Sequence, residues 1–179
     1  MVHKRDVIAF CAHAFPSGET KVPSITCVKM DDDKKNDAFR LLNTFLREDK
    51  FYLATSAAYG DEGAPALRRA LDLFLSAPEL GFVWLAYAGN EAAGVCVVCY
   101  AISTSIGAHV AKLDDVFIAP EWQRQGVASA MIQALADELR GQGVRRIDTS
   151  LYIENRGGEE FYERLGFRSL REERLALVL

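Results

Sequence analysis

Apolar residues recur every three or four positions along three stretches of the chain, which is the spacing of one face of an α-helix. The first stretch begins near Asp37, the second runs from Pro65 to Ala77, and the third from Val127 to Leu139. Pro65 suits the first turn of a helix, where the N–H that proline lacks would have no partner, and Gly141 and Gly143 are typical of a helix end. The pattern therefore predicts three amphipathic helices.

Between these stretches the pattern changes to apolar, β-branched runs of strand length. The predicted strands cover residues 25–30, 82–88, 93–103, 109–118 and 145–153, followed by short strands at 167–169 and 174–179. Gly89-Asn90-Glu91 has the composition of a hairpin turn. Asn155 is placed to cap a short helix that ends at Gly166. Phe161 and Leu165, four residues apart, are the predicted buried pair of that helix.

The predicted strand at 109–118 contains a break in its alternation. Leu113, Val116 and Ile118 cannot all lie on one face of a regular strand, because successive side chains point to opposite faces. A β-bulge between Leu113 and Val116 would bring them to one face, and burial of both faces is the alternative. No repeat or linker divides the chain. We expect one α+β domain at 25–179, after an N-terminal extension at 1–24 whose structure the pattern does not define.

Composition and charge narrow the class of protein. The chain has 179 residues, of which 50% are hydrophobic and 26% charged, and this excludes disordered, collagen-like and disulfide-dense classes. With 21 Lys+Arg against 25 Asp+Glu the net charge is −4, whereas a duplex-binding domain is normally basic, so we expect no nucleic-acid partner. The longest apolar run, residues 92–102, is shorter than the roughly 20 residues that a membrane-spanning helix needs, so we expect no membrane partner.

The cysteines and the N-terminus bear on metal binding and location. Cys96 and Cys99 form a C-x-x-C pair, but positions three apart on a strand face opposite ways, so buried thiols in a reducing cytosol are expected. No histidine spacing completes a zinc site, and the acidic run 31–36 lacks the Gly and Glu of a calcium loop. Residues 3–14 mimic a secretory signal whose apolar part is too short. The expectations are no metal and a cytoplasmic location.

Residues 123–128 lie between a predicted strand and a predicted helix. The first amides of a helix have no intrahelical acceptor and its dipole is positive there, so this end binds phosphate or pyrophosphate. Gly126 has no Cβ to keep an anion away, Ala128 is small, and Arg124 adds a positive charge. An ordinary strand-to-helix turn is the alternative. The chain contains neither a Walker A loop nor a complete dinucleotide-binding fingerprint.

Two motifs in a fixed order indicate a family. Gln123, Gly126 and Ala128 match the form [Gln/Arg]-x-x-Gly-x-[Gly/Ala], and Asn155 followed by residues 161–167, Phe-Tyr-Glu-Arg-Leu-Gly-Phe, matches a second signature. Over about residues 109–169 the chain resembles the GNAT superfamily of N-acetyltransferases, with some resemblance to its aminoglycoside 3-N-acetyltransferase branch. The resemblance implies a single domain with a mixed, mostly antiparallel sheet, splayed in the middle and flanked by about four helices.

The resemblance also implies acetyl-CoA as cosubstrate and a set of residues that hold it. Pantetheine would pair with the backbone of Val116, Phe117 and Ile118, and Asn155 and Tyr162 would contact the cofactor. The pyrophosphate would lie over the strand-to-helix loop and first helical turn, formed by Gln123, Arg124, Gln125, Gly126, Val127, Ala128 and Ser129.

Two residues carry the chemistry that the resemblance implies. An alkyl amine is mostly ammonium near neutral pH, so a base must remove a proton before attack. Asp115, before the Val-Phe-Ile run, is the first candidate, and a solvated or salt-bridged role for it is the alternative. Tyr162 would protonate the departing thiolate, unless its ring is purely structural. The other candidate bases are a water chain and the side chains of Asp114, Glu121, Glu154 and His109.

The activity implied is direct transfer of an acetyl group to an amine. A small-molecule acceptor is expected, such as an aminoglycoside or a polyamine, with a protein amine as the alternative, and the protein is expected to form a homodimer. A non-catalytic acyl-CoA-binding or regulatory domain is the competing class. Tyr162 argues against that class, because a mere binder would not require a hydroxyl there.

Overall fold

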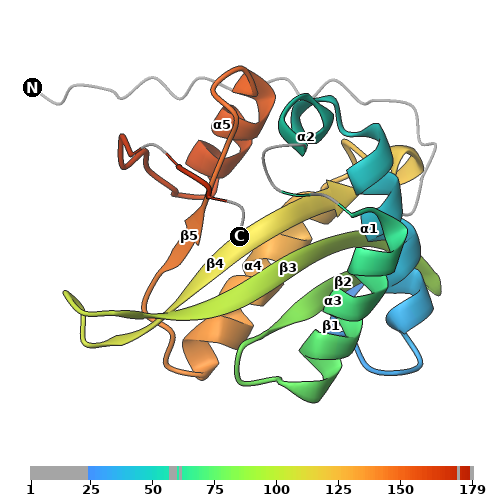
Figure 1. Cartoon of the computed structure of the whole chain (residues 1–179), viewed down its shortest axis with the longest axis horizontal. Helices are drawn as coiled ribbons and strands as arrows, with labels where there is room; N and C mark the ends of the chain where they lie inside the picture. Colours follow the sequence, from blue (N-terminus) through green and yellow to red (C-terminus); the bar gives the residue numbers. More distant parts are fainter. Residues whose placement is uncertain (1–23, 57–59, 61, 173, 178–179) are drawn as a thin grey trace, which may run out of the picture.

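A computed structural model describes residues 24–56, 60, 62–172 and 174–177, and its centre is a five-stranded sheet in the order β1-β2-β3-β4-β5 (Figure 1). The strands are β1 (Ile25–Lys29), β2 (Gly81–Ala88), β3 (Glu91–Ser103), β4 (Ala108–Ile118) and β5 (Ile147–Thr149). Neighbours from β1 to β4 pair antiparallel, and β5 pairs parallel with β4. The predicted mixed, mostly antiparallel sheet is confirmed.

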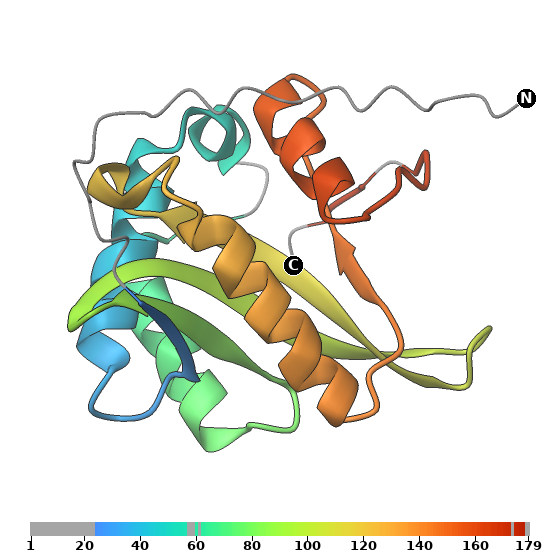
Figure 2. The ribbon, with the colours of Figure 1, turned by 180° about the vertical axis from the view of Figure 1, so that it is seen from behind.

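Helices cover both faces of the sheet. They are α1 (Lys35–Glu48), α2 (Lys50–Thr55), α3 (Ala64–Ser76), α4 (Val127–Gly141) and α5 (Arg156–Arg164). The helices α1 and α3 lie on one face, and α4 crosses the other, as the view from behind shows (Figure 2). The helices predicted from periodicity are confirmed with ends shifted by one or two residues. The six-residue α2 is too short to show a helical period, and it was not predicted.

A layer of apolar side chains packs on each face of the sheet, because helices cover both faces. Along β3, Val95 and Val97 pack in the layer under α1 and α3, whereas Cys96 and Val98 pack in the layer under α4. Trp84 of β2 donates its indole N–H to the backbone O of Met131 in α4 at 3.2 Å. The sheet and α4 are therefore tied by a buried hydrogen bond as well as by packing.

The two thiols of the C-x-x-C pair face opposite layers. Cys96 is buried under α4, while Cys99 packs against the layer of α1 and α3, and both are free. This confirms the divergence that strand geometry predicts. No cluster of three or more His, Cys, Asp or Glu side chains that could hold a metal ion occurs among the described residues.

The bulge in β4 is present. Asp114 is opposite Val97 and Phe117 is opposite Val95, so Asp115 and Val116 together face the single residue Cys96. Asp115 has a left-handed backbone with φ 49°, which is uncommon for a residue with a side chain. The extra residue restores the parity, and Leu113 and Val116 both pack in the α4 layer.

The sheet splays at the same place. β5 pairs with β4 only at Ala111, Lys112 and Leu113, and beyond the bulge β4 continues to Ile118 without β5 beside it. The strand predicted at 145–153 is therefore wrong in length, and only Ile147–Thr149 is a strand. The bulge turns β4 away from β5, so the residues after Thr149 have no ladder to join.

The predicted strands at 167–169 and 174–179 are wrong over the residues described. Residues 167–172 and 174–177 are irregular. Arg171 has φ 56°, which breaks an extended backbone, and Leu175 and Leu177 are exposed rather than packed on the sheet. The predicted extension 1–24 falls, except for Ser24, outside the described residues. None of the described helices is both long and apolar enough to cross a bilayer.

Candidate active site

The β4–α4 loop is shaped by its own side chains. A single 3₁₀ turn at Pro120–Trp122 follows β4. Gln123 Nε2 then donates to the backbone O of Ile118 at 2.9 Å, and Gln125 Nε2 donates to the backbone O of Glu121 at 2.6 Å. The two glutamines therefore brace the loop instead of extending from it.

The end of this loop leaves room above the start of α4. Gly126 caps α4 in the left-handed conformation, with φ 83°, and a Cβ built there meets nothing within 4 Å among the described residues. No side chain caps α4 in that part of the chain, so the amides of Val127, Ala128 and Ser129 are the open end of the helix. This arrangement fits a pyrophosphate, which needs close backbone N–H groups and no intervening side chain.

Val116, Phe117 and Ile118 form the strand edge past the splay. Val116 and Ile118 pack in the α4 layer and Phe117 in the layer of α1 and α3. On one side this segment pairs with β3, and its other side is past the last pair with β5. That edge fits an extended ligand lying between the two strands.

Asp115 occupies the bulge at the start of that edge. Burial, reinforced by the neighbouring charge of Asp114, raises the pKa of the Asp115 carboxyl to about 6, and Lys112 and Arg174 oppose the rise. A carboxyl with this pKa is mostly ionised at pH 7 and still accepts a proton at little cost.

The other candidate bases are less well placed. Asp114 is occupied in ion pairs, with Lys112 at 2.7 Å and Arg174 at 3.8 Å. His109 lies at the far end of β4, opposite Ile102 and stacked on the ring of Tyr100, and six residues of strand separate it from Asp115 by roughly 20 Å. Glu121 and Glu154 are exposed on loops, where a carboxylate keeps its water.

Tyr162 is buried, which corrects the expected arrangement of α5. Its side chain is 7% exposed, whereas the predicted buried pair, Phe161 and Leu165, is only half-buried. The Tyr162 ring makes edge contacts with Phe161 at 5.0 Å and with Phe167 at 5.1 Å. The helix thus turns its tyrosine inward, and Tyr162 packs in the α4 layer.

The Tyr162 hydroxyl meets Thr149 at the end of β5. Burial raises the pKa of Tyr162 to about 12, and the neighbouring Thr149 side chain opposes that rise. Thr149 Oγ1 donates to the backbone O of Leu113 at 3.0 Å, which fixes the Thr149 side chain between β4 and β5. Sequence reasoning missed Thr149, and its only signal is a hydroxyl residue at the predicted splay.

The side chain of Asn155 stabilises the start of α5. Its Oδ1 accepts a hydrogen bond from the N–H of Gly158 at 3.0 Å and caps α5, as predicted. A Cβ at position 158 would come within 2.8 Å of Asn155 Nδ2, so glycine there leaves room for the cap. The cofactor contact of Asn155 stays a prediction.

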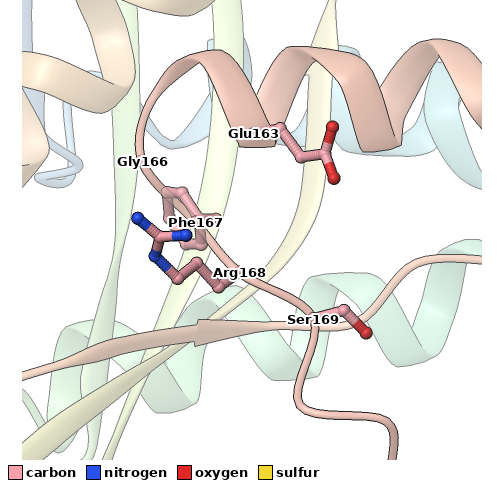
Figure 3. Close-up of a pocket in the computed structure, with 5 residues that line it drawn as sticks. All are labelled: Glu163, Gly166, Phe167, Arg168 and Ser169. Carbon is pink, nitrogen blue, oxygen red and sulfur yellow. The ribbon is translucent and has the colours of Figure 1, made fainter.

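A hollow of about 320 Å³ opens at the C-terminal end of α5 (Figure 3). Its lining consists of Glu163, Gly166, Phe167, Arg168 and Ser169. None of these is a predicted site residue, and the ring of Phe167 stands against Tyr162. The hollow is therefore separate from the β4–α4 loop and the bulge.

Comparison with known proteins identifies the family to which this chain belongs. The sequence profile of the acetyltransferase (GNAT) family matches residues 40–167. The chain belongs to the acetyltransferase (GNAT) family. Acetyl-CoA is the acetyl donor of this family, and the α4 start and the β4 edge are the parts of this member that fit it.

Two curated relatives cover about half of the chain. An uncharacterized N-acetyltransferase of Methanocaldococcus jannaschii is 30% identical over 89 residues, which are 50% of this chain and 39% of the relative. A thialysine N-epsilon-acetyltransferase of Caenorhabditis elegans is 28% identical over 87 residues, 49% of this chain and 54% of the relative. The chain thus spans about half, or less, of the length of these relatives.

A solved structure covers far more of the chain. An aminoglycoside N-acetyltransferase in complex with CoA superposes with a TM-score of 0.69 at 17% identity, over 89% of this chain and 97% of that one. At this identity the likeness concerns the fold alone. The sheet, the splay and the flanking helices are therefore those of a GNAT domain.

Proposed function

We propose that this protein is an acetyl-CoA-dependent N-acetyltransferase that transfers the acetyl group directly to an amine of a small molecule. The observation that carries the proposal is the bulge in β4. It places a carboxyl with a pKa of about 6, Asp115, directly before the strand edge 116–118 and next to the splay. A plain acyl-CoA binder has no need of a base there, and the relatives are named as acetyltransferases.

The donor would be held at three places. The amides of Val127, Ala128 and Ser129, with Arg124 at the rim, would bind the pyrophosphate, and the braced Gln123 and Gln125 keep this loop in shape. The strand edge Val116–Ile118 would pair with the pantetheine, and Asn155 would contact it from the start of α5. Acetyl-CoA supplies an acetyl group activated as a thioester.

Asp115 and Tyr162 would move the protons. The Asp115 carboxylate takes a proton from the acceptor ammonium, which frees the nitrogen lone pair to form the new C–N bond. The nitrogen releases its second proton to water as the tetrahedral intermediate collapses and the C–S bond breaks, and CoA leaves as a thiolate that accepts a hydrogen bond from the Tyr162 phenol. The pKa of the phenol, about 12, exceeds that of a thiol, near 8.5, so the phenol helps by hydrogen bonding to developing charge rather than by full transfer.

The net charge, the name of one relative and the free cysteines support the expected acceptor and location. The net charge of −4 suits a cationic amine and not a nucleic acid, and the Caenorhabditis relative is named for thialysine, a small amine. The three described cysteines are free, which fits a cytoplasmic location. A homodimer stays a prediction.

The test is turnover of acetyl-CoA with a panel of amines, read as free thiol. We expect at least one amine to give saturable CoA release and an acetylated product by mass spectrometry. Asp115→Asn should release CoA at least 100-fold more slowly while binding CoA as tightly as the wild type. CoA binding with no turnover of any amine would indicate the non-catalytic class instead.

A further inference from the structure

The end of the β3–β4 hairpin extends past the strands on either side of it (Figures 1 and 2). The pairing of β2 with β3 reaches only as far as Cys99, and the pairing of β5 with β4 reaches back only to Ala111. The hairpin beyond these two pairs is therefore a ribbon of two strands. We call residues 100–111 the ribbon.

The ribbon contains no Asp, Glu, Lys or Arg. None occurs between Glu91 and Lys112, although 26% of the residues in the chain are charged. Residues 92–98 of this run are buried in the sheet, where an uncharged composition is expected, whereas most of the ribbon is exposed. Exposed strands commonly carry lysine or proline that prevents association with another chain, and the ribbon has neither.

A hollow of about 410 Å³ lies at the base of the ribbon. Its lining consists of Ile102, Gly107, Ala108, His109 and Gly143. Gly143 comes from the loop after α4, and the other four residues belong to the ribbon. A Cβ built at Gly143 meets nothing within 4 Å among the described residues, so the hollow is open on that side.

Packed side chains hold the walls of this hollow in place. Tyr100 packs in the α4 layer, and its hydroxyl donates to Oε1 of Gln142 at 2.6 Å. The ring of His109 stacks on the ring of Tyr100, with 6.2 Å between the centroids. Ile102 follows Tyr100 by two residues on the same strand, so its side chain points to the same face. Because Ile102 is 74% exposed, it forms an apolar projection beside the hollow.

A projection and a hollow on one patch suit a two-fold dimer. In such a dimer both copies present the same patch, so a side chain that projects from one copy must meet a space on that patch of the other. Neither Ile102 nor the hollow carries an Asp, Glu, Lys or Arg side chain. Two copies with a net charge of −4 each therefore meet here without like charges at the centre of the contact.

We propose that the ribbon is the interface of a homodimer in which Ile102 of each copy enters the hollow of the other. The ribbon offers fewer residues than the roughly 20–30 on each side of a standard interface, so the dimer is weak and reversible. The interface is independent of the proposed activity, because Asp115 is six residues beyond His109 on β4, roughly 20 Å away.

The first test is sedimentation velocity of the full chain. We expect a reversible monomer–dimer equilibrium with a Kd of about 1–100 µM that changes little with salt, because no ion pair lies at the centre of the contact. Ile102→Lys should raise Kd by roughly 100-fold or more, since a two-fold interface contains the change twice. The matched control is Leu73→Lys on α3, where the leucine is 63% exposed and lies outside the ribbon, and its Kd should equal that of the wild type.

The second test places opposite charges on the projection and in the hollow. Gly143→Glu brings a carboxylate into the hollow and should also raise Kd. In a mixture of Ile102→Lys with Gly143→Glu, one of the two contacts pairs the new lysine with the new glutamate, and the other contact is that of the wild type. The mixture should therefore form dimers with a Kd roughly tenfold or more below that of either variant alone.

Three results would overturn the proposed interface. They are a wild-type chain that stays monomeric at a concentration of about 200 µM, a dimer that Ile102→Lys leaves unchanged, and no recovery in the mixture of the two folded variants. A melting curve for each variant establishes that it is folded. The kcat per chain should be equal in Ile102→Lys and the wild type, so failure of the interface and failure of acetyl transfer are observed separately.

Discussion

Asp114 and Asp115 are adjacent carboxylates on β4 with opposite surroundings. Asp114 forms ion pairs with Lys112 and Arg174. Asp115 sits in the bulge with a left-handed backbone, and burial followed by the charge of Asp114 raises its pKa to about 6. One extra residue in a strand thus separates a structural carboxylate from one poised to exchange protons.

This difference predicts a pH dependence. With acetyl-CoA and amine saturating, kcat should rise about tenfold per pH unit below pH 6 and level off above it, because Asp115 must be ionised to act as a base. Asp115→Asn should remove the limb and lower kcat by roughly 10²–10⁴ at pH 7.5. The measurement is a pH–rate profile from pH 5 to 9. If Asp115→Asn keeps the rise of kcat below pH 6, that rise belongs to another ionisable group.

The Asp115 carboxyl should also lower the free energy of unfolding at high pH. A pKa raised from 3.8 to about 6 means that the folded state binds the Asp115 proton more tightly than the unfolded state. Stability from this group is complete below about pH 4 and is lost as pH rises through 6. Asp115→Asn should therefore raise the free energy of unfolding by about 1–3 kcal/mol at pH 8 and by little at pH 4.

Urea unfolding at the two pH values measures this difference, and Asp114→Asn is the matched control. That variant removes ion pairs instead of a desolvated charge, so it should lower the free energy of unfolding by about 0–1 kcal/mol. Greater stability of Asp114→Asn and lower stability of Asp115→Asn at pH 8 would reverse the assignment.

The parts of the site that follow local rules were predictable from the sequence. The broken alternation from Leu113 to Val116 predicted the bulge, and the residue order Gln123, Gly126, Ala128 predicted an open helix start. Asn155 was predicted as a cap because a side-chain acceptor ahead of a helix has one common use. Each of these signals lies within a few residues of the feature that it predicts.

The features that depend on distant packing were not predictable. Tyr162 is buried more deeply than Phe161 and Leu165 because its ring packs in the α4 layer and against Phe167, which lie outside α5. The strand after Arg145 stops at Thr149 because β4 bends away at a bulge more than 30 residues earlier, which the periodicity of the later segment does not record. The periodicity of a sequence shows which residues share an apolar face, but it does not show which residues of other elements that face packs against.

Gly126→Glu should abolish CoA binding while the fold survives. The side chain would enter the open space at the start of α4 and bring a negative charge to the amides that would bind pyrophosphate. The matched control is Gly143→Glu, since Gly143 has a similar φ of 80° and equally open surroundings among the described residues, away from the loop. Both variants should lose about 1–2 kcal/mol of folding free energy, because a residue with a side chain is strained in the left-handed backbone conformation. Only Gly126→Glu should lose the calorimetric signal of CoA binding. Retained affinity in Gly126→Glu would make the loop a plain turn.

The last prediction concerns the buried hydroxyl of Tyr162. Burial raises the pKa of Tyr162 to about 12, and the Thr149 side chain opposes that rise. A phenol with this pKa keeps its proton at neutral pH, so it can donate a hydrogen bond to a sulfur that develops negative charge.

Tyr162→Phe keeps the ring contacts and removes only the hydroxyl. We expect kcat to fall at least tenfold, CoA affinity to stay within twofold, and the free energy of unfolding to change by no more than about 1 kcal/mol. The matched control is Thr149→Val, which removes the hydrogen bond from Thr149 Oγ1 to the backbone O of Leu113 but keeps the phenol, so it should retain more of kcat. Chemistry must be rate-limiting, which single-turnover kinetics establishes. If the two variants lower kcat equally, the hydroxyl acts through packing, and water protonates the thiolate.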